Sequence, residues 1–273
     1  MSYGLLKGKK GIIFGALNEQ SIAWKAALKA REEGAELVLT NTPVSIRLGT
    51  INELAEQCGA IVVPADATSL EDLNILVDKA MEQFDGQFDF VLHSVGMSPN
   101  IRKGRAYEDL SYDFLGKTLD ISAISFHKLL NVLYRKDALK EWGSVAALTY
   151  IAAERTFEGY NDMADAKALL ESVARSFGLI YGKKRHVRVN TVSQSPTLTT
   201  AGSGIAGMQS MFGYADKMSP LGNASASDCA DYLVTLFSDL TRHVTMQTLY
   251  HDGGFSSTGL TADAVAMFAK EGE

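Results

Sequence analysis

The stretch that decides the fold is GIIFGALNEQSIA, residues 11–23. Its apolar run predicts a short buried strand over 11–14, and the apolar spacing after it predicts a helix over 22–33. Gly15 follows the strand directly, and Gly34 is the expected C-cap of the helix. A buried strand that turns at a glycine into an amphipathic helix is the first half of a βαβ unit.

The same alternation of apolar runs and helical segments continues along the chain. Apolar runs predict strands at 35–39, 61–63, 88–92, 144–148, 187–192 and 245–251. Helical periodicity predicts helices at 50–58, 69–84, 112–135, 161–181 and 227–239. This pattern predicts an α/β fold in a single domain over 1–273, with a Rossmann-type, doubly wound parallel sheet of about seven strands and helices on both faces.

Two local features stand out within this order. Thr50 and Glu53 have the spacing of a capping box at the start of the helix over 50–58. Residues 194–220 are rich in Gly, Ser, Thr and Met and have no sustained period. We expect them to form a mobile loop that carries a short helix.

Composition excludes several classes of protein. Of the 273 residues, 46% are hydrophobic and 21% are charged, so the chain is neither fibrous nor intrinsically disordered. Its net charge of −6 and its lack of a basic block make nucleic acid and an anionic membrane surface poor partners. No apolar run approaches the roughly 18 residues of a membrane span, and the amino terminus lacks a signal sequence, so we expect a cytoplasmic protein. Cys58 and Cys229 have no other Cys or His at ligand spacing, so we expect reduced core cysteines and no metal site.

The turn between the first strand and the first helix suits a cofactor that carries phosphate. In α/β folds of this kind, a dinucleotide places its pyrophosphate on the free N–H groups at the start of the first helix. Gly15, Ser21 and Ala23 are small enough for close approach, and Ser21 can cap the helix or donate to a phosphate. A plain turn at Gly15 with a plain N-cap at Ser21 remains an alternative interpretation of this turn alone.

Later strand ends add residues at the same edge of the predicted sheet. Asp66 follows the third strand and HSVG, residues 93–96, follows the fourth, where the adenine and ribose of a dinucleotide lie. Gly96 would let the backbone approach a ribose. His93 has no carboxylate partner in the neighbouring sequence, which favours a structural histidine over a catalytic one.

Tyr160 and Lys167 form the candidate catalytic pair. At 100° per residue, seven steps bring Lys167 to within about 20° of Tyr160 on the same helix face. A helical lysine stem leans toward the N-terminus, so its ammonium can approach the Tyr160 phenol or a cofactor ribose. Tyr150, near the end of the fifth strand, presents a second hydroxyl. A tyrosine and a lysine also share a helix face in many proteins without any function, so the pair alone does not decide the matter.

Together these features resemble the short-chain dehydrogenase/reductase superfamily over essentially the whole chain, and within it the enoyl-acyl-carrier-protein reductases of bacterial type II fatty acid synthesis. Ordinary members of the superfamily place the tyrosine and the lysine four residues apart, whereas the enoyl reductases place them seven apart, as Tyr160 and Lys167 are. Further motifs that look like those of the enoyl reductases are Gly15 with Ser21-Ile22-Ala23, HSVG at 93–96, DIS at 120–122 with SF at 125–126, AER at 153–155, VRVN at 187–190 and DGGF at 252–255.

The resemblance implies an enzyme that uses NADH to reduce trans-2-enoyl thioesters carried on acyl carrier protein. It also implies that the enzyme is a homotetramer. It makes Tyr160 the hydrogen-bond donor to the developing enolate oxygen, Lys167 the partner of the nicotinamide ribose, and Tyr150 a neighbour of the acyl end. The cofactor contacts that it implies are Gly15, Ser21, Ile22, Asp66, Ala67, Ser94, Val95, Gly96, Lys167, Pro196, Thr197 and Thr199. The substrate contacts are Tyr150, Tyr160, Ile205, Met208 and Met211, and the last three equally suit plain core packing.

Three segments bear on how far the family pattern carries over. QSP at 194–196 stands where the family has Ala-Gly-Pro, and 205–212 lacks the basic residues with which close relatives meet the acidic carrier protein. Docking of the carrier is therefore expected to use other cations.

The second strand ends in LTNTP at 39–43, with neither an acidic residue nor a committed cation, and Arg47 is the nearest cation. Neutral side chains there favour NADH over NADPH, because a 2′-phosphate would lose its hydration without gaining a partner.

Two other functions remain open at this point. One is an ordinary carbonyl or alcohol oxidoreductase of the same superfamily, and the other is a scaffold that senses a dinucleotide without chemistry. The seven-residue spacing argues against the first, and the presence of both Tyr160 and Lys167 argues against the second.

Overall fold

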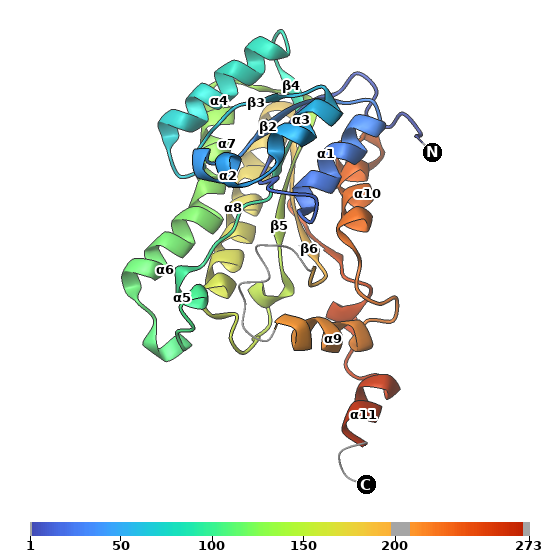
Figure 1. Ribbon diagram of the computed structural model, residues 1–273. Helices are drawn as coiled ribbons and strands as arrows, with labels where there is room; N and C mark the ends of the chain where they lie inside the picture. Colours follow the sequence, from blue (N-terminus) through green and yellow to red (C-terminus); the bar gives the residue numbers. More distant parts are fainter. Residues whose placement is uncertain (1, 198–207, 270–273) are drawn as a thin grey trace.

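The computed structural model describes residues 2–197 and 208–269, which form three layers with a sheet between helices (Figure 1). Within these residues the sheet has seven parallel strands in the order β3-β2-β1-β4-β5-β6-β7. The strand order reverses between β1 and β4, which is the switch point of a doubly wound sheet. The predicted Rossmann-type fold is confirmed.

The strands and helices follow the predicted alternation. The strands are β1 (Lys10–Phe14), β2 (Glu36–Thr40), β3 (Ile61–Val62), β4 (Phe88–His93), β5 (Leu139–Thr149), β6 (Arg188–Gln194) and β7 (Thr248–His251). The helices are α1 (Ile22–Glu32), α2 (Pro43–Leu48), α3 (Ile51–Cys58), α4 (Leu70–Gln83), α5 (Pro99–Arg102), α6 (Tyr112–Leu119), α7 (Ser125–Arg135), α8 (Asn161–Arg185), α9 (Met208–Met218), α10 (Ala226–Phe237) and α11 (Ala262–Ala269). In the parts of the chain that the structure describes, no helix is both long and apolar enough to cross a bilayer.

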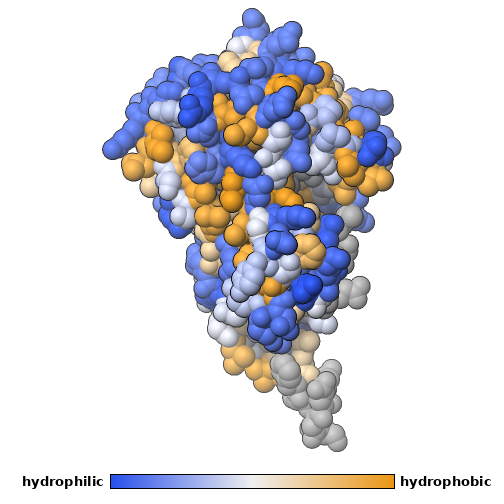
Figure 2. All heavy atoms as spheres, turned by 90° about the vertical axis from the view of Figure 1, so that its left-hand side faces the viewer, coloured by the Kyte–Doolittle hydropathy of each residue, from blue (hydrophilic) through white to orange (hydrophobic). Residues whose placement is uncertain are grey.

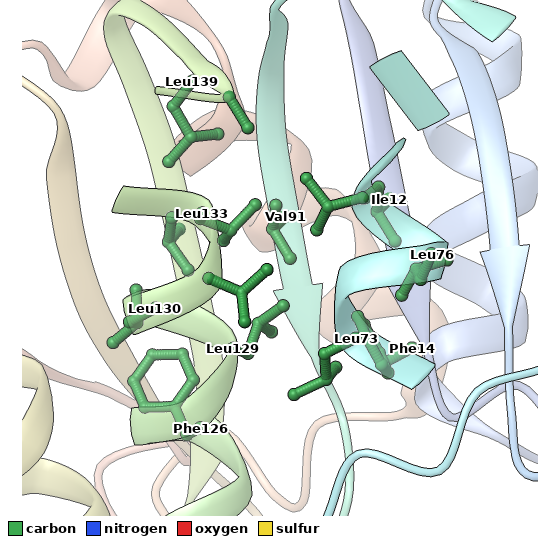
Figure 3. Close-up of a cluster of buried hydrophobic side chains, with 14 of the residues drawn as sticks. Ile12, Phe14, Leu73, Leu76, Val91, Phe126, Leu129, Leu130, Leu133 and Leu139 are labelled. Atoms are coloured by element: carbon green, nitrogen blue, oxygen red, sulfur yellow. The ribbon is translucent and has the colours of Figure 1, made fainter. Parts of the chain in front are cut away.

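Two apolar clusters hold the helices against the two faces of the sheet. On one face, α4, α7 and α8 pack on the sheet, and Figure 3 shows Leu129 and Leu133 of α7 beside Val91 of β4. On the other face, α1, α3 and α10 form a second cluster that includes Cys58 and Cys229, both buried and free as expected. Full burial of one such leucine contributes about 1.5–3 kcal/mol, so each helix is fixed by several contacts of that size.

The predicted capping box at Thr50 is not formed. Thr50 precedes α3 with φ −115° and ψ 26°, and its side chain makes no cap hydrogen bond. Only its carbonyl accepts from the Glu53 N–H, at 2.9 Å. An N-cap side chain reaches the first turn from an extended backbone, which Thr50 does not have. A capping box occurs instead at the start of α10, between Ser225 and Asp228.

The predicted helix over 112–135 is interrupted by a π-helical turn at Asp120–Ile124. In this turn the Ser122 hydroxyl accepts from the Met97 N–H at 3.0 Å and donates to the Met97 carbonyl at 3.2 Å. The turn therefore ties the helix to the loop after β4, and such turns recur at functional sites. The last strand is also shorter than the predicted 245–251, because Met246 has φ +62°, outside the strand region.

The carboxyl ends of the central strands lie side by side. Phe14 of β1 pairs with His93 of β4, and His93 pairs with Ala147 of β5. The segments that follow these strands therefore meet at one edge of the sheet, at the switch point where doubly wound folds bind their ligands.

Candidate active site

A cavity of about 750 Å³ opens at this carboxyl edge. Its volume lies in the range of small-molecule sites, roughly 300–1,000 Å³. The predicted site residues that line it are Gly15, Ser21, Ile22, Asp66, Ala67, Ser94, Val95, Gly96, Tyr150, Tyr160, Lys167, Pro196, Thr197 and Met211. Thr199 and Ile205 lie outside the described residues, and Met208 is described only as the first residue of α9. The structure thus brings together predicted residues that lie as far apart in the chain as Gly15 and Met211.

The turn after β1 is held close to the loop after β4. Gly15 has φ +94°, and a Cβ at this position would lie 1.9 Å from the carbonyl oxygen of Ser94. Only glycine permits this approach. The Ser21 hydroxyl accepts from the N–H groups of Leu17 and Asn18, at 3.2 and 3.3 Å, and makes no cap bond to α1. The N–H groups of Trp24 and Lys25 donate to the Ser21 carbonyl, so the N–H groups of Ile22 and Ala23 are the ones that suit an anion at this turn.

Tyr160 and Lys167 reach the cavity from the start of α8. Tyr160 is the residue before the helix and Asn161 has φ +45°, so the predicted helical rotation from Tyr160 to Lys167 is wrong. The Tyr160 ring centroid lies 5.1 Å from that of Tyr150, which follows β5. Lys167 Nζ donates to the Leu148 carbonyl at 2.8 Å. A Cβ placed on Gly96 would lie 3.6 Å from Nζ, so the ammonium faces the loop after β4. The two tyrosines and the lysine therefore border one space, at the ends of β4 and β5.

Burial controls the protonation of these three groups. It raises the pKa of the Tyr160 and Tyr150 phenols, with a smaller rise for Tyr150 from the charge of Asp252. Both phenols therefore keep their protons at neutral pH and can act as donors. Burial lowers the pKa of Lys167 to about 8, and the nearby Glu171 opposes this change. Lys167 is consequently mostly cationic at neutral pH.

His93 lies outside the cavity lining. It is fully buried, and its Nε2 lies 2.9 Å from Ser125 Oγ. Burial lowers its pKa to about 3, with a further decrease from the charge of Lys167, so the imidazole is neutral. The imidazole packs against the rings of Phe14 and Phe126, whose centroids lie 6.3 and 5.1 Å from its own. These contacts agree with the structural part expected for it from the sequence.

Several lining residues were not identified from the sequence. The segment after HSVG contributes Met97, Ser98, Ile101 and Arg102, and Met163 comes from the first turn of α8. The only sequence signal for the first four is their position directly after a strand end. No residue type or spacing among them marks a binding site, so their part in the wall depends on how α5 packs.

The polar groups around the cavity fit a dinucleotide. The buried Tyr150 hydroxyl has no hydrogen-bond partner within the described structure. A buried polar group without a partner costs about 1–3 kcal/mol, a cost that a bound ligand relieves. Lys167 uses one of its N–H groups on Leu148, and the start of α1 offers backbone donors. The cation and the helix start along one edge suit a ligand with ribose hydroxyls and phosphates, and the free phenol offers a hydrogen bond to a second ligand beside it.

Comparison with known proteins identifies the family. A family model described as Enoyl-(Acyl carrier protein) reductase matches residues 15–256. The chain belongs to this enoyl reductase family. It is 33% identical over 258 residues to enoyl-[acyl-carrier-protein] reductase [NADH] 2 of Rhizobium meliloti, covering 94% of this chain and 95% of that protein. It is 36% identical to the FabI enoyl-[acyl-carrier-protein] reductase [NADH] of Rickettsia bellii over 262 residues, covering 95% and 98%.

Solved structures give the same result. The FabI–NADH complex from Alistipes finegoldii shares 72% identity with this enoyl reductase family member, covers 96% of this chain and 93% of its own, and has a TM-score of 0.95. The reductase (NADH) of Aquifex aeolicus shares 31% identity, covers 94% and 100%, and has a TM-score of 0.87. The family assignment made from the sequence is confirmed.

Proposed function

We propose that this chain uses NADH to reduce the trans-2 double bond of enoyl thioesters carried on acyl carrier protein, a step of fatty acid elongation. The observation that carries this proposal is the cavity that Tyr150, Tyr160 and Lys167 share with the turn at Gly15. The named relatives are enoyl-acyl-carrier-protein reductases that use NADH, and the structure from Alistipes finegoldii is a complex with NADH. The product is the saturated acyl thioester.

The cofactor is assigned to the carboxyl edge of the sheet. We assign its pyrophosphate to the start of α1 beside Gly15 and Ser21, and its nicotinamide ribose to Lys167. Asn41 and Thr42 line the cavity at the end of β2, and both are neutral. Arg47 is not part of the described lining, so a 2′-phosphate would meet no cation there, in keeping with NADH as the reductant. When bound, the reduced nicotinamide supplies the hydride that adds to C3 of the enoyl group.

Tyr160 is proposed to donate a hydrogen bond to the thioester oxygen, on which negative charge develops as C3 is reduced. Its raised pKa keeps the donor protonated, and its partly buried ring fixes the direction of the phenol. One such donor is worth about 3–4 kcal/mol of transition-state stabilisation in other enzymes. Protonation at C2 completes the reduction.

The other side chains are proposed to place the substrate. Lys167 holds a positive charge beside the reacting groups, and Tyr150 shapes the acyl end of the cavity. Met211 of α9 lines the cavity and gives it an apolar wall that adapts to the acyl chain. Ile205, Met208 and Thr199 keep their sequence-based assignments as proposals.

The experiment that tests the function compares substrates. Oxidation of NADH is followed by absorbance with crotonyl thioester and with a panel of ketones. Turnover of the thioester alone is expected. Turnover of ketones alone would indicate a carbonyl oxidoreductase, and tight binding of NADH without any turnover would indicate a sensing scaffold.

The carrier protein is proposed to dock beside α5. Arg102 is exposed and lines the cavity, and Lys103 and Arg105 follow it at the surface. Within the described residues, none of these three has a carboxylate within 4.0 Å, although Glu108 and Asp109 follow them in the chain. The triple replacement by alanine is expected to lower kcat/KM for carrier-bound crotonyl thioester about tenfold or more. Turnover of a neutral short thioester serves as the control and should not change.

We also propose a cytoplasmic homotetramer. Figure 2 shows hydrophobic residues between hydrophilic ones on the side of the molecule that carries the left-hand helices of Figure 1. Ile124 between α6 and α7, and Leu179 and Ile180 of α8, are exposed apolar side chains that suit a symmetric helix interface. Sedimentation velocity at micromolar concentration tests the assembly, and a monomer would contradict it.

A further inference from the structure

Asp162 is a buried acidic residue that the proposed chemistry does not use. It lies in the first turn of α8, two residues after Tyr160, with none of its surface exposed. Its Oδ1 accepts from the Ser98 hydroxyl at 2.6 Å. Its Oδ2 accepts from Asn100 Nδ2 at 2.7 Å. The Thr118 hydroxyl lies 2.7 Å from the same oxygen and 2.9 Å from the Phe114 carbonyl, and its one proton points to the nearer Asp162 oxygen. All three partners are neutral, and no ion pair involves Asp162 in the parts of the chain that the structure describes.

These bonds join three separate elements beside the cavity. Ser98 and Asn100 belong to the start of α5, Thr118 belongs to α6, and Asp162 belongs to α8. Ser98 and Ile101 are themselves part of the cavity wall. A buried carboxyl group is expensive unless its oxygens are bonded, so the arrangement of α5, α6 and α8 that supplies all three donors is strongly favoured over its alternatives.

The same elements surround Tyr160. Its ring packs against the cluster of Ile101, Met163 and Ala166, and on another side against Tyr150. Asn161, between Tyr160 and Asp162, has φ +45°, and its side-chain amide donates to the Arg105 carbonyl. A left-handed residue that is not glycine persists only where its neighbours are held in place. The direction of the Tyr160 phenol therefore depends on how this helix start is anchored.

We propose that Asp162 is a positioning residue for the reduction: through Ser98, Asn100 and Thr118 it fixes the start of α8 against α5 and α6, and so holds the Tyr160 phenol at one place in the cavity. Asp162 is not part of the described cavity lining and acts only through Tyr160. The inference rests on the proposed function, because the effect on turnover requires Tyr160 to act on the substrate.

The test is a double-mutant cycle of Asp162→Asn with Tyr160→Phe. In Asp162→Asn an NH₂ group replaces one carboxylate oxygen, so the hydroxyl that it faces must turn to accept, and the bonds that join α5, α6 and α8 rearrange. We therefore expect kcat to fall about 10- to 100-fold, as for a small misplacement of a catalytic group. The KM and dissociation constant of NADH should stay within about twofold of wild type. In the Tyr160→Phe background the same substitution should change kcat by less than about twofold, because no phenol remains to be positioned. Asp165→Asn, on the same helix but bonded to Tyr107, is the matched control and should leave kcat unchanged.

Two further measurements cover the other outcomes. If Asp162→Asn does not fold, Thr118→Val removes one donor and is expected to give a smaller, equally non-additive loss of kcat. Fluorine NMR of protein labelled with fluorotyrosine tests the position of Tyr160 without turnover, with its signal assigned by its absence in Tyr160→Phe. A single Tyr160 signal in wild type that becomes broad or multiple in the Asp162 or Thr118 variant supports the proposal.

The proposal is overturned by additive losses in the cycle, by parallel loss of NADH affinity and kcat, or by an unchanged Tyr160 signal. If the wild type turns over no enoyl thioester, the proposed function fails. The NMR result still decides whether Asp162 positions Tyr160.

Discussion

Replacing Tyr160 with phenylalanine removes one oxygen atom and keeps the ring. The ring packs against Ile101, Met163 and Ala166, and these contacts are unchanged in the variant, so the fold is expected to stay intact. What is lost is the one proposed donor to the thioester oxygen. A single donor of this kind contributes about 3–4 kcal/mol in the transition state, which at 1.36 kcal/mol per tenfold predicts a fall in kcat of about 10²- to 10³-fold.

Binding of NADH should hardly change in this variant. The phenol acts on charge that develops during the reaction, so its loss affects the transition state and leaves ground-state binding alone. The measurement is kcat with crotonyl thioester and the dissociation constant of NADH from fluorescence titration, on the same protein sample.

A matched control is Tyr181→Phe. Tyr181 is also buried, but its hydroxyl donates to the Leu130 carbonyl at 2.9 Å and lies outside the described cavity lining. This variant is expected to lose about 1 kcal/mol of stability and no turnover. The reasoning about Tyr160 is refuted if its variant keeps full turnover, or if NADH affinity falls in proportion to kcat.

Three other predictions follow from the same cavity. Lys167→Ala should weaken NADH binding about tenfold or more, since the assigned ribose partner is lost, and normal affinity in a titration would exclude that role. Wild-type kcat/KM for NADH should fall as pH rises through about 8, where Lys167 loses its proton. Lys167→Arg should move this fall to higher pH, because arginine keeps its proton there. An identical pH profile for the two proteins would contradict the assignment. Gly15→Ala should lower the free energy of unfolding by more than about 1 kcal/mol and weaken NADH binding, because its Cβ would collide with the Ser94 carbonyl at φ +94°, and an unchanged melting temperature would count against this.

Much of the fold could be predicted because its signals are local. The side-chain period of a strand or a helix is a property of its own backbone, so the apolar run at 11–14 and the helical spacing after it are visible in one stretch of sequence. The predictions that were wrong depended on detail beyond the period. The capping box at Thr50 required a particular backbone angle, and the π-helical turn at 120–124 depends on the contact of Ser122 with Met97.

The part of the candidate site that follows the strand ends could also be predicted from the sequence. Parallel strands bring their carboxyl ends to one edge, so residues placed after strands, such as Gly15, Gly96 and Tyr150, were expected to meet, and they line one cavity. The wall formed by Ser98, Ile101 and Arg102 could not be predicted in this way, because it depends on where a short helix packs.

The sequence by itself determined the alternation of strands and helices and the edge of the sheet at which the site lies. How Tyr160 and Lys167 come together depends on the tertiary structure, because Tyr160 precedes α8 and Asn161 has φ +45°. Only the tertiary structure decided what Asp162 does. In the sequence it is an ordinary acidic residue of a first helical turn, yet it is fully buried and bonded to Ser98 and Thr118, which lie 64 and 44 residues away in the chain. Hydrogen bonds between such distant segments exist only once α5, α6 and α8 have packed, and the pattern of no single segment records that packing.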